Sequence, residues 1–323
     1  MSQSNLAIQQ PEEEPSQSSK QKAGAEGTGN TEANVALHQP ELLQSRSPEQ
    51  QAELERIGRI EPYAGVQRDK DLFDRLNHWR DLKICARLTT VDRLGLSKAL
   101  YFYTQQCIKR RGDFLEIPVA VAYIEVEQHG SPTDLFLLIL EFLSNPFDCR
   151  PLRDLRARTW GTLKGYGVKI LIVNNADLLS FAAFNELARI SEKLKISVIL
   201  AGSPFLNDIL DPRSNKKKRY INIHNTFLKY HQFDLLSPSD TATVIQEWEN
   251  SGLCWSKPLN LVSNSEIVTL LHKASQGQLR PLYEHLREIA VWRLDHPNAQ
   301  VNPQNISQAL GVQYQPIPNL KQV

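Results

Sequence analysis

The segment KILIVNNADLL, residues 169–179, places two amide side chains where a buried apolar run ends. Ile170 to Val173 predict a buried strand, and Asn174 and Asn175 follow it directly. Two carboxylates at such a strand end could hold Mg²⁺ and orient an attacking water for phosphoryl transfer. An amide carries no charge and takes no proton at neutral pH, so we expect no hydrolysis here. The alternative is an ordinary strand-to-helix turn, which favours Asn because its side chain caps backbone groups.

Composition sets the bounds within which this strand must be placed. The chain has 323 residues, which is enough for two packed units plus tails. Its formal net charge is +1, so it has no global polyanion-binding signature. Residues 1–57 hold nine Glu against four Lys and Arg, a net of −5, which leaves about +6 for the remainder. The N-terminus is polar, so we expect no signal peptide, and no apolar run reaches the ~20 residues of a membrane span.

The four cysteines are scattered and argue for reduced thiols in a cytoplasm. None of them forms a CxxC pair or stands at metal-binding distance from a histidine, so we expect no zinc site and no other bound metal. They are Cys85, Cys107, Cys149 and Cys254.

The chain divides into a tail, an α/β domain, a helical subdomain and a second tail. Residues 1–57 are too poor in aromatic and β-branched residues to bury a core, so we expect a disordered acidic tail, whose end (48–57) could begin a helix. Between 58 and 236, buried strands alternate with helices, which predicts a parallel sheet covered on both faces. The expected strands are 85–88, 117–126, 167–173 and 196–201, and the expected helices are 69–82, 97–108, 134–143, 151–163 and 181–195. Residues 237–302 read as helices only (240–250, 265–275 and 280–294), and a C-terminal tail, 303–323, could open with a last helix.

Four sequence blocks occur in order: TLKGYGVKILIVNNADLL, ISVILAGSPFLNDIL, FDLLSPSD and ASQGQLRPLYEHLREIA. With them the chain, from about Tyr63 to Arg293, resembles the AAA+ regulators of DNA transposition, the TniB/TnsC group found also in CRISPR-associated transposons. The resemblance implies an α/β P-loop NTPase (AAA+) fold followed by a small helical lid subdomain. It also implies an ATPase that forms rings or filaments on target DNA and recruits a transposase.

The resemblance exposes a degenerate Walker A loop. The motif G-x-x-x-x-G-K-[ST] wraps phosphates with backbone N–H groups and adds a Lys and a Mg²⁺-binding hydroxyl. The matching stretch, TVDRLGLS, keeps Gly95 and Ser97, but Thr90 replaces the first Gly and Leu96 replaces the Lys. Its Asp would place a negative charge where phosphates should lie, although the adjacent Arg93 could offset that charge. Lys98 stands one residue late, about 100° further round the helix, and rescues phosphate binding only in a shifted register.

The remaining nucleotide-sensing positions are degraded as well. Ser203 matches sensor 1, but a Ser after Gly is more typical of a helix N-cap. The arginine-finger positions of the family fall on Thr226 and Leu228, and the sensor 2 position falls on Pro281, with Arg280 beside it. Each tenfold loss of rate corresponds to about 1.4 kcal/mol, and several such factors are missing. Loss of both the nucleotide-binding pocket and the arginine finger favours an adaptor, a protein that caps the end of a filament, or an assembly that needs no nucleotide. It argues against an integrated subunit of an ATP-driven ring.

Candidate DNA contacts come from basic residues and from one loop. Arginines cluster around the helix 151–163, at Arg150, Arg153, Arg156 and Arg158, with Lys164 and Lys169 beyond. The loop 128–133 has no Lys, but Ser131 and Thr133 could donate to phosphate oxygens. A second basic run is Lys216, Lys217, Lys218 and Arg219. The alternatives are a solvated helix face paired with Asp148 and Asp154, and an ordinary surface loop.

We therefore predict a catalytically inactive AAA+-like protein without a cofactor. It would act as an adaptor or scaffold on double-stranded DNA, with an active TnsC-like ATPase, a TniQ-like targeting protein or a transposase as partner. Assembly into an oligomer is left open. One alternative is a weak ATP-binding regulator that uses Ser97, Lys98, Ser203 and Arg280, with ATP and Mg²⁺ as cofactors. Another is a module that recruits partners through the acidic tail without touching DNA.

Overall fold

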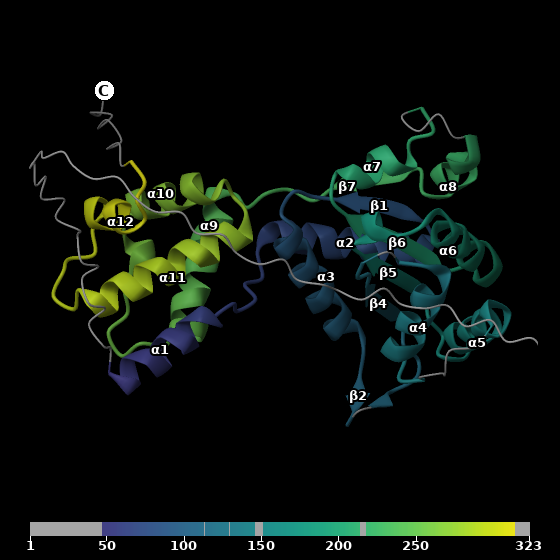
Figure 1. Ribbon diagram of the computed structural model, residues 1–323, viewed down its shortest axis with the longest axis horizontal. Coiled ribbons are helices and arrows are strands. Elements are labelled where there is room, and N and C mark those ends of the chain that lie inside the picture. Colours follow the sequence, from purple (N-terminus) through teal and green to yellow (C-terminus); the bar gives the residue numbers. More distant parts are fainter. Residues whose placement is uncertain (1–46, 113, 129, 146–150, 214–217, 314–323) are drawn as a thin grey trace, which may run out of the picture. The chain divides into compact units, whose positions relative to one another are not determined.

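A five-stranded, fully parallel sheet forms the α/β part of the computed structural model, which describes residues 47–112, 114–128, 130–145, 151–213 and 218–313. The strand order is β4-β5-β6-β1-β7 (Figure 1). The strands are β1 (Ala86–Thr89), β4 (Val121–Glu125), β5 (Ile170–Asn174), β6 (Ser197–Gly202) and β7 (Lys229–Gln232). The sheet and four of its strands were predicted, whereas the edge strand β7 was not.

Helices cover both faces of this sheet and bury its inner strands on both sides. Alternate residues of β5 enter different cores: Ile170 and Ile172 pack with one set of helices, and Leu171 and Val173 with the other. The first face carries α2 (Gln67–Leu82) and α3 (Arg93–Cys107). The second carries α4 (Pro132–Phe142), α5 (Leu152–Gly165), α6 (Phe181–Leu194), α7 (Phe205–Leu210) and α8 (Ile221–Thr226), with short turns η1 (Ala176–Leu178) and η2 (Lys218–Tyr220). This arrangement confirms the predicted fold class.

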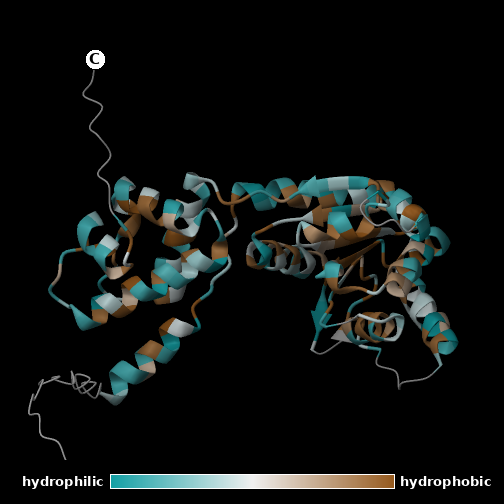
Figure 2. Ribbon diagram, turned by 45° about the horizontal axis from the view of Figure 1, so that its top comes forward, coloured by the Kyte–Doolittle hydropathy of each residue, from teal (hydrophilic) through white to brown (hydrophobic). Residues whose placement is uncertain are grey.

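A separate core belongs to the helical part that follows the sheet. It contains α9 (Pro238–Glu247), η3 (Trp248–Leu253), η4 (Leu261–Ser263), α10 (Ser265–Ser275), α11 (Leu279–Asp295) and α12 (Pro303–Ala309). Hydrophobic residues recur along one side of these helices in Figure 2, as amphipathic packing requires. The predicted helices 265–275 and 280–294 match α10 and α11 within one residue at each end.

Helix α1 (Pro48–Gly58) belongs to this helical core, so the boundary predicted at residue 57 falls inside a helix. Ser47 and Gln50 form a capping box that starts the helix, and Ile57 is 1% exposed in the core. The Arg56 guanidinium donates to the carbonyl oxygens of Gly252 and Leu253, which ties the helix to the end of η3. The rest of the predicted acidic tail, residues 1–46, lies outside the described residues.

A short hairpin, β2 (Arg110–Arg111) with β3 (Phe114–Leu115), interrupts the connection from α3 to β4. It was not predicted, because two-residue strands carry no periodic signal. Figure 1 shows β2 projecting away from the sheet. Among the described residues, no helix has the length and apolar character needed to cross a membrane.

Candidate functional site

Helix α3 begins at Arg93, four residues earlier than the sequence predicted. Asp92 causes this early start, because its Oδ1 accepts a hydrogen bond from the Gly95 backbone N–H at 3.2 Å and so caps the helix. The Leu96 N–H is already bonded to the Asp92 carbonyl oxygen. Residues 93–97 of the predicted phosphate-binding stretch are therefore helical, and residues 90–92 form the turn before the helix.

The Asp92 carboxylate joins three elements at the start of α3. Besides the Gly95 N–H, it accepts a hydrogen bond from the Leu279 backbone N–H, the first residue of α11, at 3.1 Å. Its other oxygen lies 2.8 Å from the Arg68 guanidinium of α2. Asp92 is 2% exposed. A helix N-terminus attracts anions, and here the anion is part of the chain.

Arg68, rather than the predicted Arg93, neutralises this buried carboxylate. Its side chain is 7% exposed, it donates to the Asp234 carbonyl oxygen at 2.7 Å, and it lies 4.5 Å from the centre of the Phe233 ring. Arg93 instead donates to Asn175 Oδ1 at 2.7 Å. A Cβ atom at Gly95 would come within 2.5 Å of Arg68 and 2.2 Å of Asp92, so the predicted phosphate-loop glycine is required by this ion pair.

Two other predicted Walker A residues serve the fold. The Thr90 hydroxyl donates to the Phe233 carbonyl oxygen and accepts from the Asp92 N–H, both at 3.0 Å, which fixes the turn before α3. Leu96 is 2% exposed and packs in the core beneath α2 and α3. The Leu96 side chain, which the sequence alignment predicted at the lysine position, is therefore part of the core.

Asn174 meets Ser97, as the Walker B and Walker A positions should. Asn174 is 2% exposed, and its Nδ2 donates to Ser97 Oγ at 2.8 Å and to the Tyr123 hydroxyl at 3.0 Å. An amide hydrogen bond thus joins β5 to α3 directly. Among the described residues there is no group of three or more His, Cys, Asp or Glu that could hold a metal ion.

Asn175 adopts the left-handed conformation (φ 54°), which Asn tolerates better than most residues. Its Nδ2 donates to Glu125 Oε1 at 3.0 Å and to the Val126 carbonyl oxygen at 3.3 Å. Glu125 ends β4 directly beside Asn174 of β5 in the register. The sequence interpretation missed this carboxylate, although a charged residue at the end of an apolar strand could have signalled it.

Ser203 does not cap a helix, in contrast to the favoured prediction, whereas the predicted role of Arg280 stays a prediction. Ser203 Oγ donates to Asp177 Oδ2 at 2.9 Å, and Pro204 is the N-cap of α7, so the Ser203 side chain is no helix cap. A Cβ at Gly202 would lie 2.4 Å from Asp177, so the end of β6 is fitted closely to that carboxylate. Arg280 is the second residue of α11 and is exposed.

Lys98 is paired within the chain. Its Nζ lies 2.9 Å from the Glu61 carbonyl oxygen and 3.2 Å from the Glu61 carboxylate, and 5.6 Å from the centre of the Tyr283 ring. Arg287 of α11 binds the same carboxylate at 2.7 Å. These hydrogen bonds outweigh burial, which would raise the pKa of Glu61, and hold that pKa below its usual value. The substitute lysine therefore helps to tie α3 to the segment before α2.

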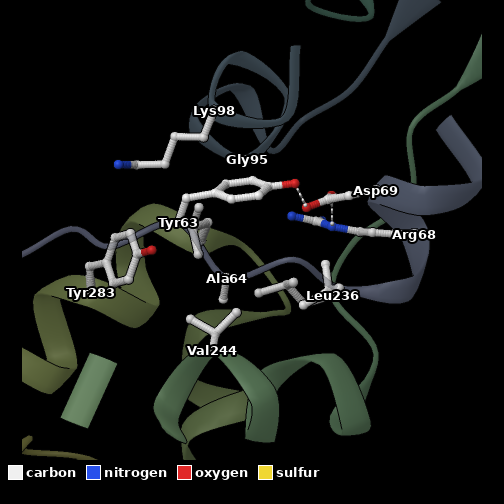
Figure 3. A pocket seen from close by; sticks show the side chains of 11 residues that line it. Tyr63, Ala64, Arg68, Asp69, Gly95, Lys98, Leu236, Val244 and Tyr283 are labelled. Carbon is white, nitrogen blue, oxygen red and sulfur yellow. Dashed lines mark hydrogen bonds and ion pairs between the residues drawn. The ribbon is translucent and has the colours of Figure 1, made fainter. Parts of the chain in front are cut away.

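The space beside Gly95 is small. Figure 3 shows side chains from the segment before α2, from α3 and from the helical part closing around it. Its volume for the centres of water-sized molecules is ≈ 10 Å³, room for about one water, whereas drug-sized ligands occupy pockets of roughly 300–1,000 Å³. It is lined by Tyr63, Ala64, Val66, Arg68, Asp69, Gly95, Lys98, Leu236, Val244, Leu279 and Tyr283.

Asp69 is the perturbed acid of this lining. Burial raises its pKa to about 6, despite hydrogen bonding from the Tyr63 hydroxyl (2.8 Å) and the charge of Arg68. Burial also raises the pKa of Tyr63. Asp69 Oδ1 and Arg68 Nε are buried, have no hydrogen-bond partner among the described residues, and lie 3.7 Å apart. The charged groups of this lining therefore interact with one another.

Residues 83–210 match the family model described as an AAA domain. That stretch runs from just before β1 to the end of α7, so the match covers β1, β4, β5 and β6 of the sheet and helix α3, in a chain with the P-loop NTPase fold. No curated protein matches the chain.

Solved structures similar to the chain include the following two. The Drosophila ORC structure bound to DNA is 15% identical, with a TM-score of 0.49, over 88% of this chain and 70% of that chain. The Thermotoga maritima RuvB Holliday junction branch migration motor is 9% identical, with a TM-score of 0.46, over 77% and 69%.

The predicted DNA contacts lie on three elements. Thr133 is in the first turn of α4, where Ser131 forms a capping box with Asp134, so the Ser131 hydroxyl already has a role in the helix start. Arg153 is exposed on α5, and Lys218 is exposed in η2. Arg150, Lys216 and Lys217 lie outside the described residues.

Two of the α5 arginines have partners in neighbouring elements, whereas Asp148, one of the partners in the alternative interpretation, lies outside the described residues. Arg156 of α5 binds Glu186 of α6 through two hydrogen bonds, and Arg158 donates to Asn145. At least two of the clustered arginines therefore hold the domain together.

Proposed function

We propose that the protein is a nucleotide-independent AAA+-fold adaptor or scaffold. The observation that carries this proposal is the Asp92–Arg68 pair, which occupies the start of α3 and spans from the sheet to α11. A triphosphate at that position would meet a buried carboxylate. It would also have to displace hydrogen bonds that Asp92 already makes to Gly95 and Leu279.

The residues around this pair do not fit Mg²⁺·ATP. Leu96 is buried, Asn174 and Asn175 carry no charge, and the space beside Gly95 is that of about one water. A metal-bound triphosphate needs cations and acidic ligands at these positions. These features support a pseudo-ATPase, in which the fold persists without turnover.

The role in transposition rests on the four sequence blocks shared with TniB/TnsC-type regulators. In that setting the protein would connect target-site selection with the transposase on double-stranded DNA. An active TnsC-like ATPase, a TniQ-like targeting protein or the transposase would be its partner. Thr226 and Leu228, at the arginine-finger positions, offer no cation to a neighbouring pocket, which supports an adaptor over a working ring subunit.

Titration of the purified chain with ATP and Mg²⁺ tests the proposal. We expect no binding heat at sub-millimolar ATP, no change in the thermal midpoint and no phosphate release. The Ser97→Ala variant should behave as the wild type does. Sub-millimolar binding, or ATP turnover that disappears in Ser97→Ala, would contradict nucleotide independence.

A weak ATP-binding regulator is the second candidate, and Glu125 favours it. This carboxylate lies 3.0 Å from the Asn175 amide and 3.4 Å from the Asn174 amide, so an acid is still present beside the Walker B positions. If it orients water, Glu125→Gln should abolish a slow ATPase activity while leaving ATP affinity unchanged. Equal basal phosphate release from wild type and variant would remove this candidate.

A further inference from the structure

We infer that the edge of the sheet where its five strands begin is a binding surface for the sugar–phosphate backbone of double-stranded DNA. This inference rests on the DNA-associated role proposed above and assigns that role a surface. All five strands are parallel, so all of them begin at one edge, opposite to the edge that carries Asn174 and Asp92.

Exposed cations stand before or at the start of every strand along this edge. One or more precede each of β1, β4, β5 and β6, and one is the first residue of β7. They are Lys83, Lys109, Arg110, Arg111, Lys164, Lys169, Lys193, Lys195 and Lys229. Within the described parts of the chain, none of these nine forms an ion pair.

The charge of this edge differs from that of the whole chain. The segments leading into the five strands (80–85, 107–120, 163–169, 192–196 and 226–229) contain ten Lys and Arg and four Asp and Glu, a net of +6. The whole chain has a net of +1. The remaining residues therefore sum to −5, and the positive charge is gathered at one edge.

The backbone fixes the spacing of the strand starts along this edge. Val121, Ile170 and Ser197 lie side by side in the register, and the Lys169 backbone is bonded to both Ala120 and Ser197. Neighbouring strands are about 4.8 Å apart, so five strands span roughly 19 Å. Duplex DNA carries one charge per about 1.7 Å of its axis, so several phosphates face such a length.

Helix dipoles account for only part of this pattern. The last turn of a helix favours a cation, and Lys83, Lys193 and Lys195 stand at the ends of α2 and α6. The hairpin after α3 needs a different reason, because Lys109, Arg110 and Arg111 lie beyond the helix end. Figure 2 shows β2 as a hydrophilic strand.

The geometry of the hairpin suits a backbone contact. Arg110 pairs with Leu115 and Arg111 with Phe114, so the two arginines point to opposite faces of the ribbon. Gly112, with φ +62°, makes the tight turn at the tip. A series of cations is suited to phosphates of a duplex, whereas single strands are usually held on several aromatic platforms.

Fluorescence anisotropy with a labelled duplex of about 30 base pairs tests the surface, from roughly 50 to 200 mM salt. One variant combines Lys109→Ala, Arg110→Ala and Arg111→Ala, and a second combines Lys169→Ala, Lys193→Ala and Lys195→Ala. The matched control, Lys70→Ala with Lys257→Ala and Lys273→Ala, removes three exposed lysines elsewhere. Thermal unfolding of each variant verifies that it is folded.

We expect each edge variant to weaken binding at least tenfold, with the control at wild-type affinity. Each lost phosphate contact should lower the slope of log K against log salt by about 0.9. Edge variants that bind as the wild type does would overturn the inference and leave the DNA role standing. That outcome would gain weight if Arg153→Ala with Lys218→Ala abolished binding. A wild-type chain that fails to bind duplex at low salt would instead refute the DNA role itself.

Discussion

Replacing Asp92 with Ala should destabilise the protein far more than loss of a helix cap does. The Asp92 carboxylate accepts hydrogen bonds from Gly95 and Leu279 and forms an ion pair with Arg68, all while 2% exposed. Loss of an N-cap costs about 1 kcal/mol, and an unpaired buried N–H about 1–3 kcal/mol. Breaking a buried ion pair by removing one partner costs about 3–5 kcal/mol.

These contributions overlap, because one carboxylate makes all three contacts. Arg68 also keeps the Asp234 carbonyl oxygen as a partner, which reduces the penalty of leaving it buried. We therefore expect Asp92→Ala to lower the free energy of unfolding by about 4 kcal/mol. For a domain of this size, that is a fall of roughly 10 °C in Tm.

Urea denaturation of the full chain, followed by circular dichroism, measures the change. Ser180→Ala is the matched control, since the Ser180 hydroxyl caps α6 and, among the described residues, makes no hydrogen bond to another element; this variant should lose about 1 kcal/mol of stability. A double-mutant cycle with Arg68→Ala should give a coupling energy of about 2 kcal/mol. The reasoning fails if Asp92→Ala costs no more than Ser180→Ala, or if the two Asp92 and Arg68 losses are additive.

Three further predictions follow from buried or paired side chains. Asp69→Asn should remove a pH dependence of the free energy of unfolding. Because the folded pKa of about 6 exceeds the unfolded value, the wild-type protein should lose about 2–3 kcal/mol of stability, relative to the variant, as pH rises from 4 to 7. Urea midpoints at several pH values measure this difference. Glu61→Gln weakens the contacts to Lys98 and Arg287 and should lower the free energy of unfolding by about 1 kcal/mol at pH 7. Because the folded pKa of the wild-type Glu61 is lowered, the wild-type protein loses this stabilisation as pH falls through that pKa, and the two proteins should be equally stable in acid. Leu96→Lys should not restore ATP binding and should unfold the chain, because it buries an ammonium in the core beneath α3; a folded Leu96→Lys protein that binds Mg²⁺·ATP in calorimetry would contradict this.

The sequence predicted those strands of the sheet whose own residues form an apolar run. Strands buried on both faces read as continuous apolar runs, so β5 and β6 were placed within a few residues of their bounds. Strand β7 (KYHQ) has no such run, because it is an edge strand with mostly exposed residues and depends on pairing with β1. A helix was predicted to begin at residues 48–57, as α1 does, but its membership of the helical core was not predicted, because Ile57 is the one buried residue of a polar helix.

The sequence predicted where along the chain the candidate site lies, but not which residues fill it. The Asn174 amide donates to Ser97 in the first turns of α3, and the Thr90 hydroxyl fixes the turn before that helix through Phe233 and Asp92. The residues that fill the site come from far along the chain, since Asp92 contacts Arg68 across 24 residues and Leu279 across 187. Spacing within a motif cannot indicate such partners, because a lone Asp in a turn is compatible with either an open loop or a closed one.

The closed loop changes what the fold can regulate. A ligand stabilises the arrangement it binds only while it is present, so nucleotide exchange can switch an ATPase between states. In this chain the group that joins α3 to α11 is the carboxylate of Asp92, which is covalently part of the protein. Its local concentration never changes, and neither hydrolysis nor product release can remove it. Under the proposed function, the contact between sheet and helical part is therefore constitutive, which suits a scaffold that stays assembled while its partners come and go.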